Sequence, residues 1–406
     1  MENKRYTNYR YIIQGIWILI TLIQYYLPFA AAPLLTEIMG TFSVDYVLGG
    51  YIITIVAVCG GLSMYASNII IQRLGVKKGI LCALCAFVLG DFITVTAASY
   101  PILMFGRCLI GIGYGLTAAF NGALTVAWFP PKEQAFINTL NTVMGTLGQT
   151  LAYSVTIPLF YMTGSWRTLF MYAGIFTVIV LILWTVLGKN PKADSPADST
   201  QESGSVSESS GMKQALAHRE IRILIFVCIS LFLSYTAFAT YLPAFLTETR
   251  GIDAAAASNL ASIMTIAGLI GSLAVGSLCG ITGRRKPFMW PMIALMMIGV
   301  LGVLFVNNIF ALSVSIFLIG FGCNAYLPPM YTFIMDLKDA NPAMVASSMA
   351  LTIGTANIFN VFNPMIFSSM MPITGMRGAF GIYAAILFAG AVASLLLPET
   401  GKGKTK

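Results

Sequence analysis

KNPKADSPADSTQESGSVSESSGMKQALAHRE, residues 189–220, is the stretch that decides how the sequence on either side of it is interpreted. Ser, Pro, Gly and charged residues dominate it, so it buries too little apolar surface to repay the entropy of ordering. We therefore expect a flexible linker. Very apolar sequence of similar length lies on each side, which predicts two membrane-embedded halves, residues 1–188 and 221–406, joined by this solvated segment.

The composition of the whole chain indicates a membrane protein. Hydrophobic residues make up 57% of it and charged residues only 9%, whereas a soluble domain carries about 25% charged residues. A helix rises about 1.5 Å per residue, so some 20 apolar residues cross a hydrocarbon core of about 30 Å. We expect an all-α membrane protein with twelve spans, near residues 11–35, 46–71, 79–99, 102–128, 135–162, 169–188, 223–246, 256–281, 288–306, 309–335, 346–371 and 378–397.

The distribution of positive charge predicts the topology. Of the 23 Lys and Arg residues, 19 fall in the termini, the linker and the loops on that same side. Three others, Arg167, Arg250 and Arg377, fall in the opposite loops, and Arg107 falls inside a span. By the positive-inside rule both termini and the linker are cytoplasmic, in a multi-pass protein of the cell membrane. The net charge of +8 then reflects topology, and we expect no nucleic-acid partner.

Two charged side chains lie deep in the predicted spans. Arg107 is a permanent cation, which has to face the bundle interior or a water-filled cavity. Asp91 precedes the turn between spans three and four by about eight residues, and Arg107 follows it by about six, so we expect similar depths and an ion pair. Such a pair either locks two helices together or takes part in transport, with Arg107 binding substrate and Asp91 coupling. As one unit, it would tolerate Arg107→Ala better than Asp91→Ala, because a lone carboxylate can take up a proton.

Uncharged polar side chains supply the remaining candidate contacts. Asn138, Asn141 and Gln149 lie within about 100° of one face of span five. Amides facing lipid would lack hydrogen-bond partners, so this face meets protein or water. Either helix–helix hydrogen bonding or substrate binding explains them. Pro328 and Pro329 predict a break in span ten. The other candidates for substrate contact are Tyr25, Asn121, Tyr235, Tyr241, Asn324, Tyr331, Asn357 and Asn360.

The cysteines and the single histidine indicate no metal or cofactor site. All seven cysteines lie in apolar stretches, and Cys82 and Cys85 form a C-x-x-C without a second pair. Thiolates are disfavoured there, so we interpret these residues as small buried apolar side chains. His218 lies in the linker. We expect no metal, no cofactor and no enzymatic nucleophile–base pair.

Landmarks of the first half recur in the second at an offset of about 209 residues. Leu-Ile-Gly-Ile-Gly at 109–113 matches Leu-Ile-Gly-Phe-Gly at 318–322, and Trp166-Arg167 matches Met376-Arg377. The turn at Gly75 matches the one at Gly283. Two halves related by a parallel repeat predict a substrate site at their interface, near the bilayer midplane.

These motifs resemble those of the major facilitator superfamily of secondary transporters, over essentially the whole chain. The resemblance implies a twelve-helix fold of two six-helix halves. The family's span-four signature, R-x-x-x-G-x-G, is present as Arg107, Gly111 and Gly113, and the G-P-x-x-G-G of drug/proton antiporters is absent. Tyr241–Phe245 is similar to cyanate-type and related small-anion carriers. The family's loop signature, G-x-L-x-D-R-x-G-R-K, implies cytoplasmic gating loops at Arg73, Gly75 and Lys77 and at Gly276, Gly283, Arg284 and Arg285, with Gln72 and Gly280 at its acidic position.

The sequence thus favours a secondary transporter working by alternating access. Its substrate is expected to be a small polar solute, an organic or inorganic anion above all, with a proton or another co-ion. The alternative is a multidrug/proton antiporter that exports lipophilic compounds. A membrane-embedded enzyme, a receptor and a channel have no supporting motif. We expect a monomer in the lipid bilayer.

Overall fold

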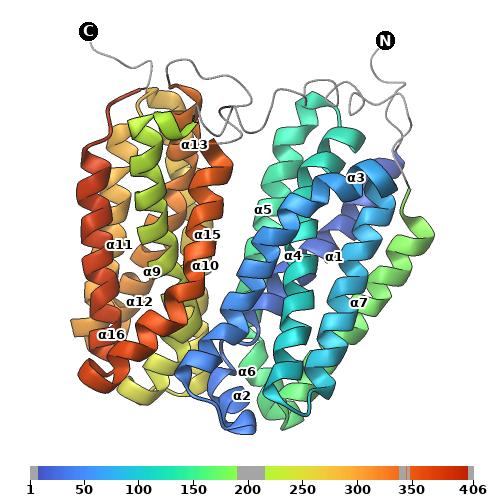
Figure 1. Ribbon diagram of the computed structural model, residues 1–406, viewed down its shortest axis with the longest axis horizontal. Helices are drawn as coiled ribbons and strands as arrows, with labels where there is room; N and C mark the ends of the chain where they lie inside the picture. Colours follow the sequence, from blue (N-terminus) through green and yellow to red (C-terminus); the bar gives the residue numbers. More distant parts are fainter. Residues whose placement is uncertain (1–7, 190–214, 338–343, 345–347, 401–406) are drawn as a thin grey trace. The chain divides into compact units, whose positions relative to one another are not determined.

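The computed structural model describes residues 8–189, 215–337, 344 and 348–400. The chain divides into two compact units, residues 1–204 and 205–406, and each described part is a bundle of helices (Figure 1). The division falls within the predicted linker, of which residues 190–214 lie outside the described part.

The N-terminal unit holds one long helix pair and several shorter elements. α3 is one continuous element of two antiparallel crossings, because Gly75 between them adopts φ 73°, a left-handed conformation that favours glycine. α1 ends at Phe29, earlier than the predicted limit of span one, ahead of Pro33, which has no N–H for a helix to use. The helices are α1 (Tyr9–Phe29), α2 (Leu35–Phe42), α3 (Tyr46–Thr96), α4 (Tyr100–Trp128), α5 (Pro131–Ser154), α6 (Thr156–Thr163) and α7 (Trp166–Leu187).

The C-terminal unit repeats this plan with its own interruptions. The predicted break in span ten is confirmed, since α12 ends at Ala325 and α13 begins at Leu327, directly before Pro328. Gly375, at φ 67°, separates two crossings within α16. The elements are α9 (Arg219–Arg250), α10 (Ala254–Thr282), η3 (Lys286–Phe288), α11 (Trp290–Phe305), α12 (Ile309–Ala325), α13 (Leu327–Met335), η4 (Ala350–Gly354), α15 (Thr355–Phe359), η5 (Asn360–Phe362) and α16 (Asn363–Leu395).

The described residues account for the twelve predicted spans. Ten helical stretches are long and apolar enough to cross a bilayer. The last of them, residues 351–395, turns at Gly375 and so contains two crossings. The remaining span is α5 with α6, whose amides and hydroxyls lower its mean hydropathy.

Glycine contacts show that the repeat is structural. A Cβ on Gly111 would lie 2.7 Å from the Val56 carbonyl oxygen, and a Cβ on Gly90 would lie 2.7 Å from that of Gly106. The C-terminal unit has the same close approaches 208 to 209 residues later: Gly320 meets Met264, and Gly299 meets the Ser315 carbonyl. Small residues therefore set the backbone spacing at equivalent helix crossings in both units.

The two units differ in charge at these equivalent helix crossings. Asp91 and Arg107 of the N-terminal unit each follow one of these glycine-contact residues, Gly90 and Gly106. The positions 209 residues later are Val300 and Ile316, and all four side chains are buried. Helix packing of this kind therefore does not itself require the two charges.

Candidate functional site

A chain of amides joins three helices of the N-terminal unit. Gln14 Nε2 of α1 donates to Asn141 Oδ1 of α5 at 2.6 Å, and Asn141 Nδ2 donates to Asn121 Oδ1 of α4 at 2.8 Å. The indole Nε1 of Trp17 donates to the same Asn121 oxygen at 2.9 Å. The structure thus brings together two predicted residues, Asn121 and Asn141. Gln14 and Trp17 were not predicted; an amide inside the apolar first span was the available signal for Gln14.

Two amide atoms near this chain lack a hydrogen-bond partner. Gln14 Oε1, an acceptor, and Gln149 Nε2, a donor two turns beyond Asn141 on α5, are both buried and unpartnered. Leaving such a buried group unpaired costs roughly 1–3 kcal/mol. A polar solute that donates to Gln14 Oε1 or accepts from Gln149 Nε2 would recover part of this energy.

Aromatic rings and a second glutamine extend the polar region along α1. The rings of Tyr25 and Tyr114 meet edge to face with centroids 5.9 Å apart, and Gln24 Nε2 donates to the Tyr114 carbonyl at 3.2 Å. Gly145 leaves room for Tyr25, since a Cβ there would lie 2.8 Å from its ring. Asn138, on the same helix as Asn141, is exposed.

Arg107 is fully buried and bonded to backbone. Its Nε donates to the Ile52 carbonyl at 2.8 Å, Nη1 to that of Leu27 at 3.1 Å and Nη2 to that of Pro28 at 2.7 Å. Leu27 and Pro28 lie in the last turn of α1, where carbonyls lack intrahelical partners and the helix dipole is negative. The cation therefore caps α1 and ties it to α3 and α4.

The predicted ion pair between Asp91 and Arg107 is not formed. The two groups interact electrostatically at longer range. The ion pairs within the described residues join other groups: Arg10–Glu133, His218–Glu220 and Arg285–Asp336. The prediction was wrong because it matched depth alone, whereas the carbonyls at the end of α1 take up the guanidinium. Asp91 is buried, and its Oδ1 has no hydrogen-bond partner.

The candidates in the C-terminal unit are dispersed. The ring of Tyr241 stacks on Phe367 at 4.0 Å between centroids, inside the core. Asn324 Nδ2 donates to the Gly320 carbonyl at 3.3 Å, within its own helix. Asn360 is buried, and its Oδ1 has no partner. The other predicted residues, Tyr235, Tyr331 and Asn357, are partly buried.

One predicted loop is held by a polar cluster. Arg285 Nε donates to Asp336 Oδ2 at 2.9 Å, and its Nη1 donates to the Cys279 carbonyl at 2.9 Å. The Glu399 carboxylate accepts from the backbone N–H groups of Arg285 and Lys286, at 2.8 and 3.1 Å. Gly283 adopts φ 65° there.

The remaining loop residues take no part in this cluster. Arg284 and Arg73 are exposed, and the Lys77 carbonyl accepts from Trp184 Nε1 at 3.1 Å. Gly276 packs against Pro328.

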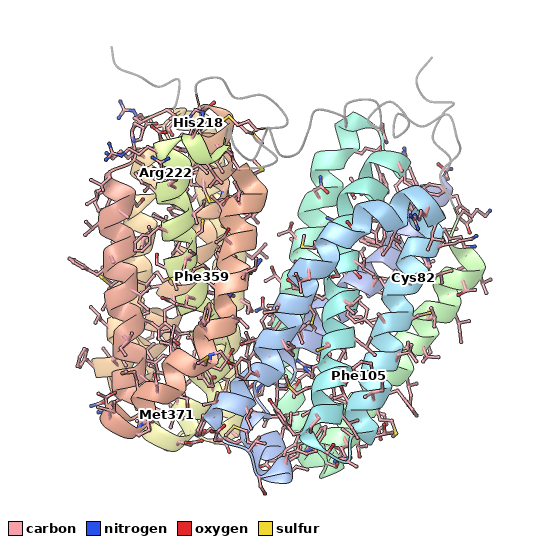
Figure 2. The ribbon with its side chains drawn as sticks, viewed as in Figure 1. Cys82, Phe105, His218, Arg222, Phe359 and Met371 are labelled. Atoms are coloured by element: carbon pink, nitrogen blue, oxygen red, sulfur yellow. The ribbon has the colours of Figure 1, made fainter. Side chains whose placement is uncertain are left out.

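Cys82 and Cys85 correct another expectation. Both are exposed rather than buried, and Cys82 is labelled in Figure 2. They lie about one turn apart on the same helical face, so when one of them is exposed the other is exposed as well. Within the described part of the chain, no three His, Cys, Asp or Glu side chains lie close enough to hold a metal.

Comparison with known proteins identifies the family of this chain. A family model described as "Major Facilitator Superfamily" matches residues 17–258 and 232–406. The chain belongs to the major facilitator superfamily. It is therefore a multi-pass membrane protein and a secondary transporter, a class that binds small-molecule substrates, rather than an enzyme.

The relatives of the chain include transporters described for different substrates. The chain is 23% identical over 375 residues to a "Probable sugar efflux transporter" of Mannheimia succiniciproducens, covering 91% of this chain and 89% of that protein. It is 24% identical over 393 residues to a "Probable sulfoacetate transporter SauU" of Cupriavidus necator, covering 90% and 88%. A solved bacterial homologue of the human lysosomal transporter Spinster shares the fold, with a TM-score of 0.80, 15% identity and coverage of 96% and 97%.

Proposed function

We propose that this transporter moves a small polar solute by alternating access, with the amide chain of α1, α4 and α5 as part of its binding site. The observation that carries the proposal is the presence of two buried, unpartnered amide atoms in this unit: Gln14 Oε1, whose side chain bonds to Asn141, and Gln149 Nε2, two turns further along α5. Amides provide both donors and acceptors, as a hydroxylated or carboxylated solute requires. A sugar efflux transporter and a sulfoacetate transporter among the relatives support this class of substrate.

A small anion is the first subclass that we propose. Arg107 is a buried cation with no carboxylate in direct contact, so its charge favours anions at longer range. Because each of its nitrogens donates to a backbone carbonyl, direct binding of the substrate by Arg107 would first require those bonds to break. We therefore assign direct contact to the amides and long-range attraction to Arg107.

Several further properties belong to the same proposal. The charge asymmetry of the loops supports cytoplasmic termini in a cell membrane. A proton is the proposed co-ion, with Asp91 as the candidate that carries it; loss of pH dependence in Asp91→Asn would support this role. Arg285 and its partners are proposed to hold a cytoplasmic gating loop. Tyr235, Tyr331, Asn357 and Asn360 stay candidates for the C-terminal contribution to the site, and a monomer is the proposed functional form.

A ligand panel tests the substrate class. Purified protein is heated with carboxylates, sulfonates, sugars, nucleosides and lipophilic cations, since a ligand that binds only the native state raises Tm. Stabilisation by small anions, lost in Asn141→Leu and kept in Asn138→Ala, is the expected result. Stabilisation by lipophilic cations alone, if it is kept in Asp91→Asn, would instead favour the multidrug alternative.

A further inference from the structure

A cavity between α3 and α7 contains the buried acid Asp91. Its volume is about 390 Å³, within the range of small-molecule sites. Apart from Asp91 and Thr96, its walls are apolar. The lining residues are Val88, Asp91, Phe92, Val95 and Thr96 from α3, and Met171, Gly174, Ile175, Val178 and Ile179 from α7.

The carboxylate of Asp91 is only 1% exposed, yet Oδ1 accepts no hydrogen bond. Its other oxygen, Oδ2, lies against Gly174, where an added Cβ would clash with it. The glycine thus leaves room for the carboxylate. Since Val300 occupies the equivalent place in the repeat, the fold does not need an acid here, and a buried acceptor without a partner points to a missing donor.

The cavity opens on the outer face of the bundle. Phe92, Ile175 and Ile179 line it with 64%, 51% and 50% of their surfaces exposed. Large apolar side chains that are exposed on membrane-spanning helices face lipid. A ligand can therefore enter this cavity from the hydrocarbon core of the bilayer. Asp91 lies five residues before the end of α3, which corresponds to about 8 Å along the helix axis from that end. Above it, Arg167 Nη1 donates to the Val95 carbonyl at 3.1 Å.

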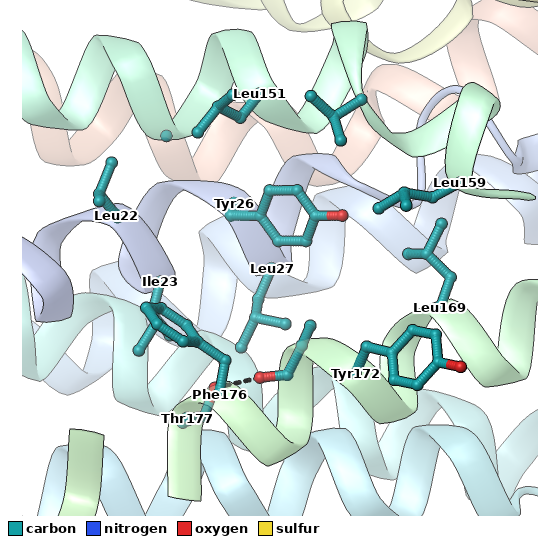
Figure 3. Close-up of a pocket in the computed structure, with 13 residues that line it drawn as sticks. Leu22, Ile23, Tyr26, Leu27, Leu151, Leu159, Leu169, Tyr172, Phe176 and Thr177 are labelled. Atoms are coloured by element: carbon teal, nitrogen blue, oxygen red, sulfur yellow. Dashed lines mark hydrogen bonds between the residues drawn. The ribbon is translucent and has the colours of Figure 1, made fainter. Parts of the chain in front are cut away.

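A second cavity on the other flank of α7 gives a useful contrast. It has a volume of about 310 Å³ and is lined mainly by leucines and aromatic rings (Figure 3). There the Tyr26 hydroxyl is 3.3 Å from Thr156 Oγ1, and Thr177 donates to the Ala173 carbonyl at 2.8 Å. The Tyr26 and Thr177 hydroxyls are thus already partnered, and no carboxylate lines this cavity.

We propose that the Asp91 cavity is a binding site for a lipophilic amine that enters from the bilayer. The ammonium group donates to Asp91 Oδ1, and the apolar body lies along Val88, Val95 and Val178. In its ionised form the carboxylate only accepts hydrogen bonds, so an apolar ligand would leave it unpaired and an anion would be repelled. A free amine fits better than an aminophospholipid, whose phosphate would have to descend below the helix end to bring its amine to Asp91. The inference does not depend on the transported substrate.

Three probes with the same apolar body test the proposal: 1-adamantanamine, 1-adamantanol and adamantane-1-carboxylate. Binding is measured by thermal shift on the full chain in phosphatidylcholine nanodiscs. The amine should bind about tenfold or more tightly than the alcohol, as a charge-assisted hydrogen bond predicts, and the carboxylate should not bind. Equal binding of amine and alcohol would overturn the assignment of an ammonium partner.

Variants locate the site. Asp91→Asn keeps the shape of the side chain and should weaken amine binding about tenfold or more. Gly174→Ala should do the same while keeping the acid, because its methyl group displaces the carboxylate; it also tests the site if Asp91→Asn fails to fold. Glu37→Gln removes an exposed carboxylate of α2 and should leave binding unchanged. Unaltered amine binding in Gly174→Ala and Asp91→Asn would overturn the proposal. Loss of amine binding to the wild type in phosphatidylethanolamine nanodiscs would also overturn it, because it would assign the cavity to the aminophospholipid.

Discussion

Arg107 Nη2 lies 2.7 Å from the carbonyl oxygen of Pro28, in the last turn of α1. This bond, with those to Leu27 and Ile52, makes the buried cation part of the backbone architecture of the N-terminal unit. Arg107 therefore couples the position of α1 to that of α4, because any movement of one helix against the other either breaks these bonds or moves the Arg107 side chain with α1.

We predict that Arg107→Ala destabilises the protein more than Asp91→Ala does. Removing Arg107 leaves three buried carbonyls without their donor, at a cost on the order of 3 kcal/mol, whereas Asp91 Oδ1 has no partner to lose. The order is the reverse of the one expected from an ion pair. Thermal unfolding in detergent compares the two variants, with Arg107→Ile, which copies Ile316 of the repeat, as a control for lost volume. A lower Tm for Asp91→Ala would restore a dominant pair.

We predict that Gln14 and Asn141 are energetically coupled. Gln14→Leu leaves Asn141 Oδ1 without its donor, and Asn141→Leu leaves Gln14 Nε2 without its acceptor. Either loss costs roughly 1–3 kcal/mol, whereas replacing both residues removes this penalty. A double-mutant cycle on the free energy of unfolding should therefore give a coupling of about 0.5–3 kcal/mol. Additive effects would mean that their 2.6 Å contact contributes little.

We predict that Gly111→Ala and Gly320→Ala each destabilise their own unit. In each case the new Cβ meets a backbone carbonyl, of Val56 or Met264, that cannot move alone, and overpacking costs about 1–3 kcal/mol. Gly61→Ala is the matched control: it lies in α3 with nothing within 4 Å, so improved helix propensity gives up to about 1 kcal/mol of stabilisation. Equal behaviour of all three variants would contradict the close-packed crossings.

We predict that Arg285→Ala slows transport while Arg284→Ala does not. Arg285 holds Asp336 and the Cys279 carbonyl, whereas its neighbour is exposed. If the cluster stabilises one state of the transport cycle, the substrate Kd should change less than the transport rate. Stopped-flow uptake and equilibrium binding separate the two effects. An equal loss in both variants would assign the effect to loop charge alone.

The sequence predicted the twelve spans, the repeat and the break in span ten because each leaves a local pattern. A run of apolar residues, a pair of prolines and glycines in matching places need no knowledge of the neighbouring helices. The partners of Arg107 could not be predicted in this way. They are backbone carbonyls of Leu27, Pro28 and Ile52, and any residue type has a carbonyl.

The same reasoning explains the part of the candidate site that was missed. Asn121 and Asn141 stood out as amides in spans, but their connection through Gln14 depends on how α1 and α5 cross. Cys82 and Cys85 were placed inside because apolar sequence alone does not distinguish a side chain facing lipid from one facing protein. In a membrane both the lipid and the protein interior are apolar, so the hydrophobic pattern does not show which side chains are buried in the protein.

Solute flux into proteoliposomes tests the central claim most directly. Protein reconstituted with a stabilising small polar solute should show saturable, vectorial uptake. Asn141→Leu should reduce that uptake about tenfold or more while Asn138→Ala leaves it near the wild-type rate, since only Asn141 belongs to the amide chain. Full uptake by Asn141→Leu, with correct folding shown by its Tm, would contradict the account and remove the amide chain from the substrate site.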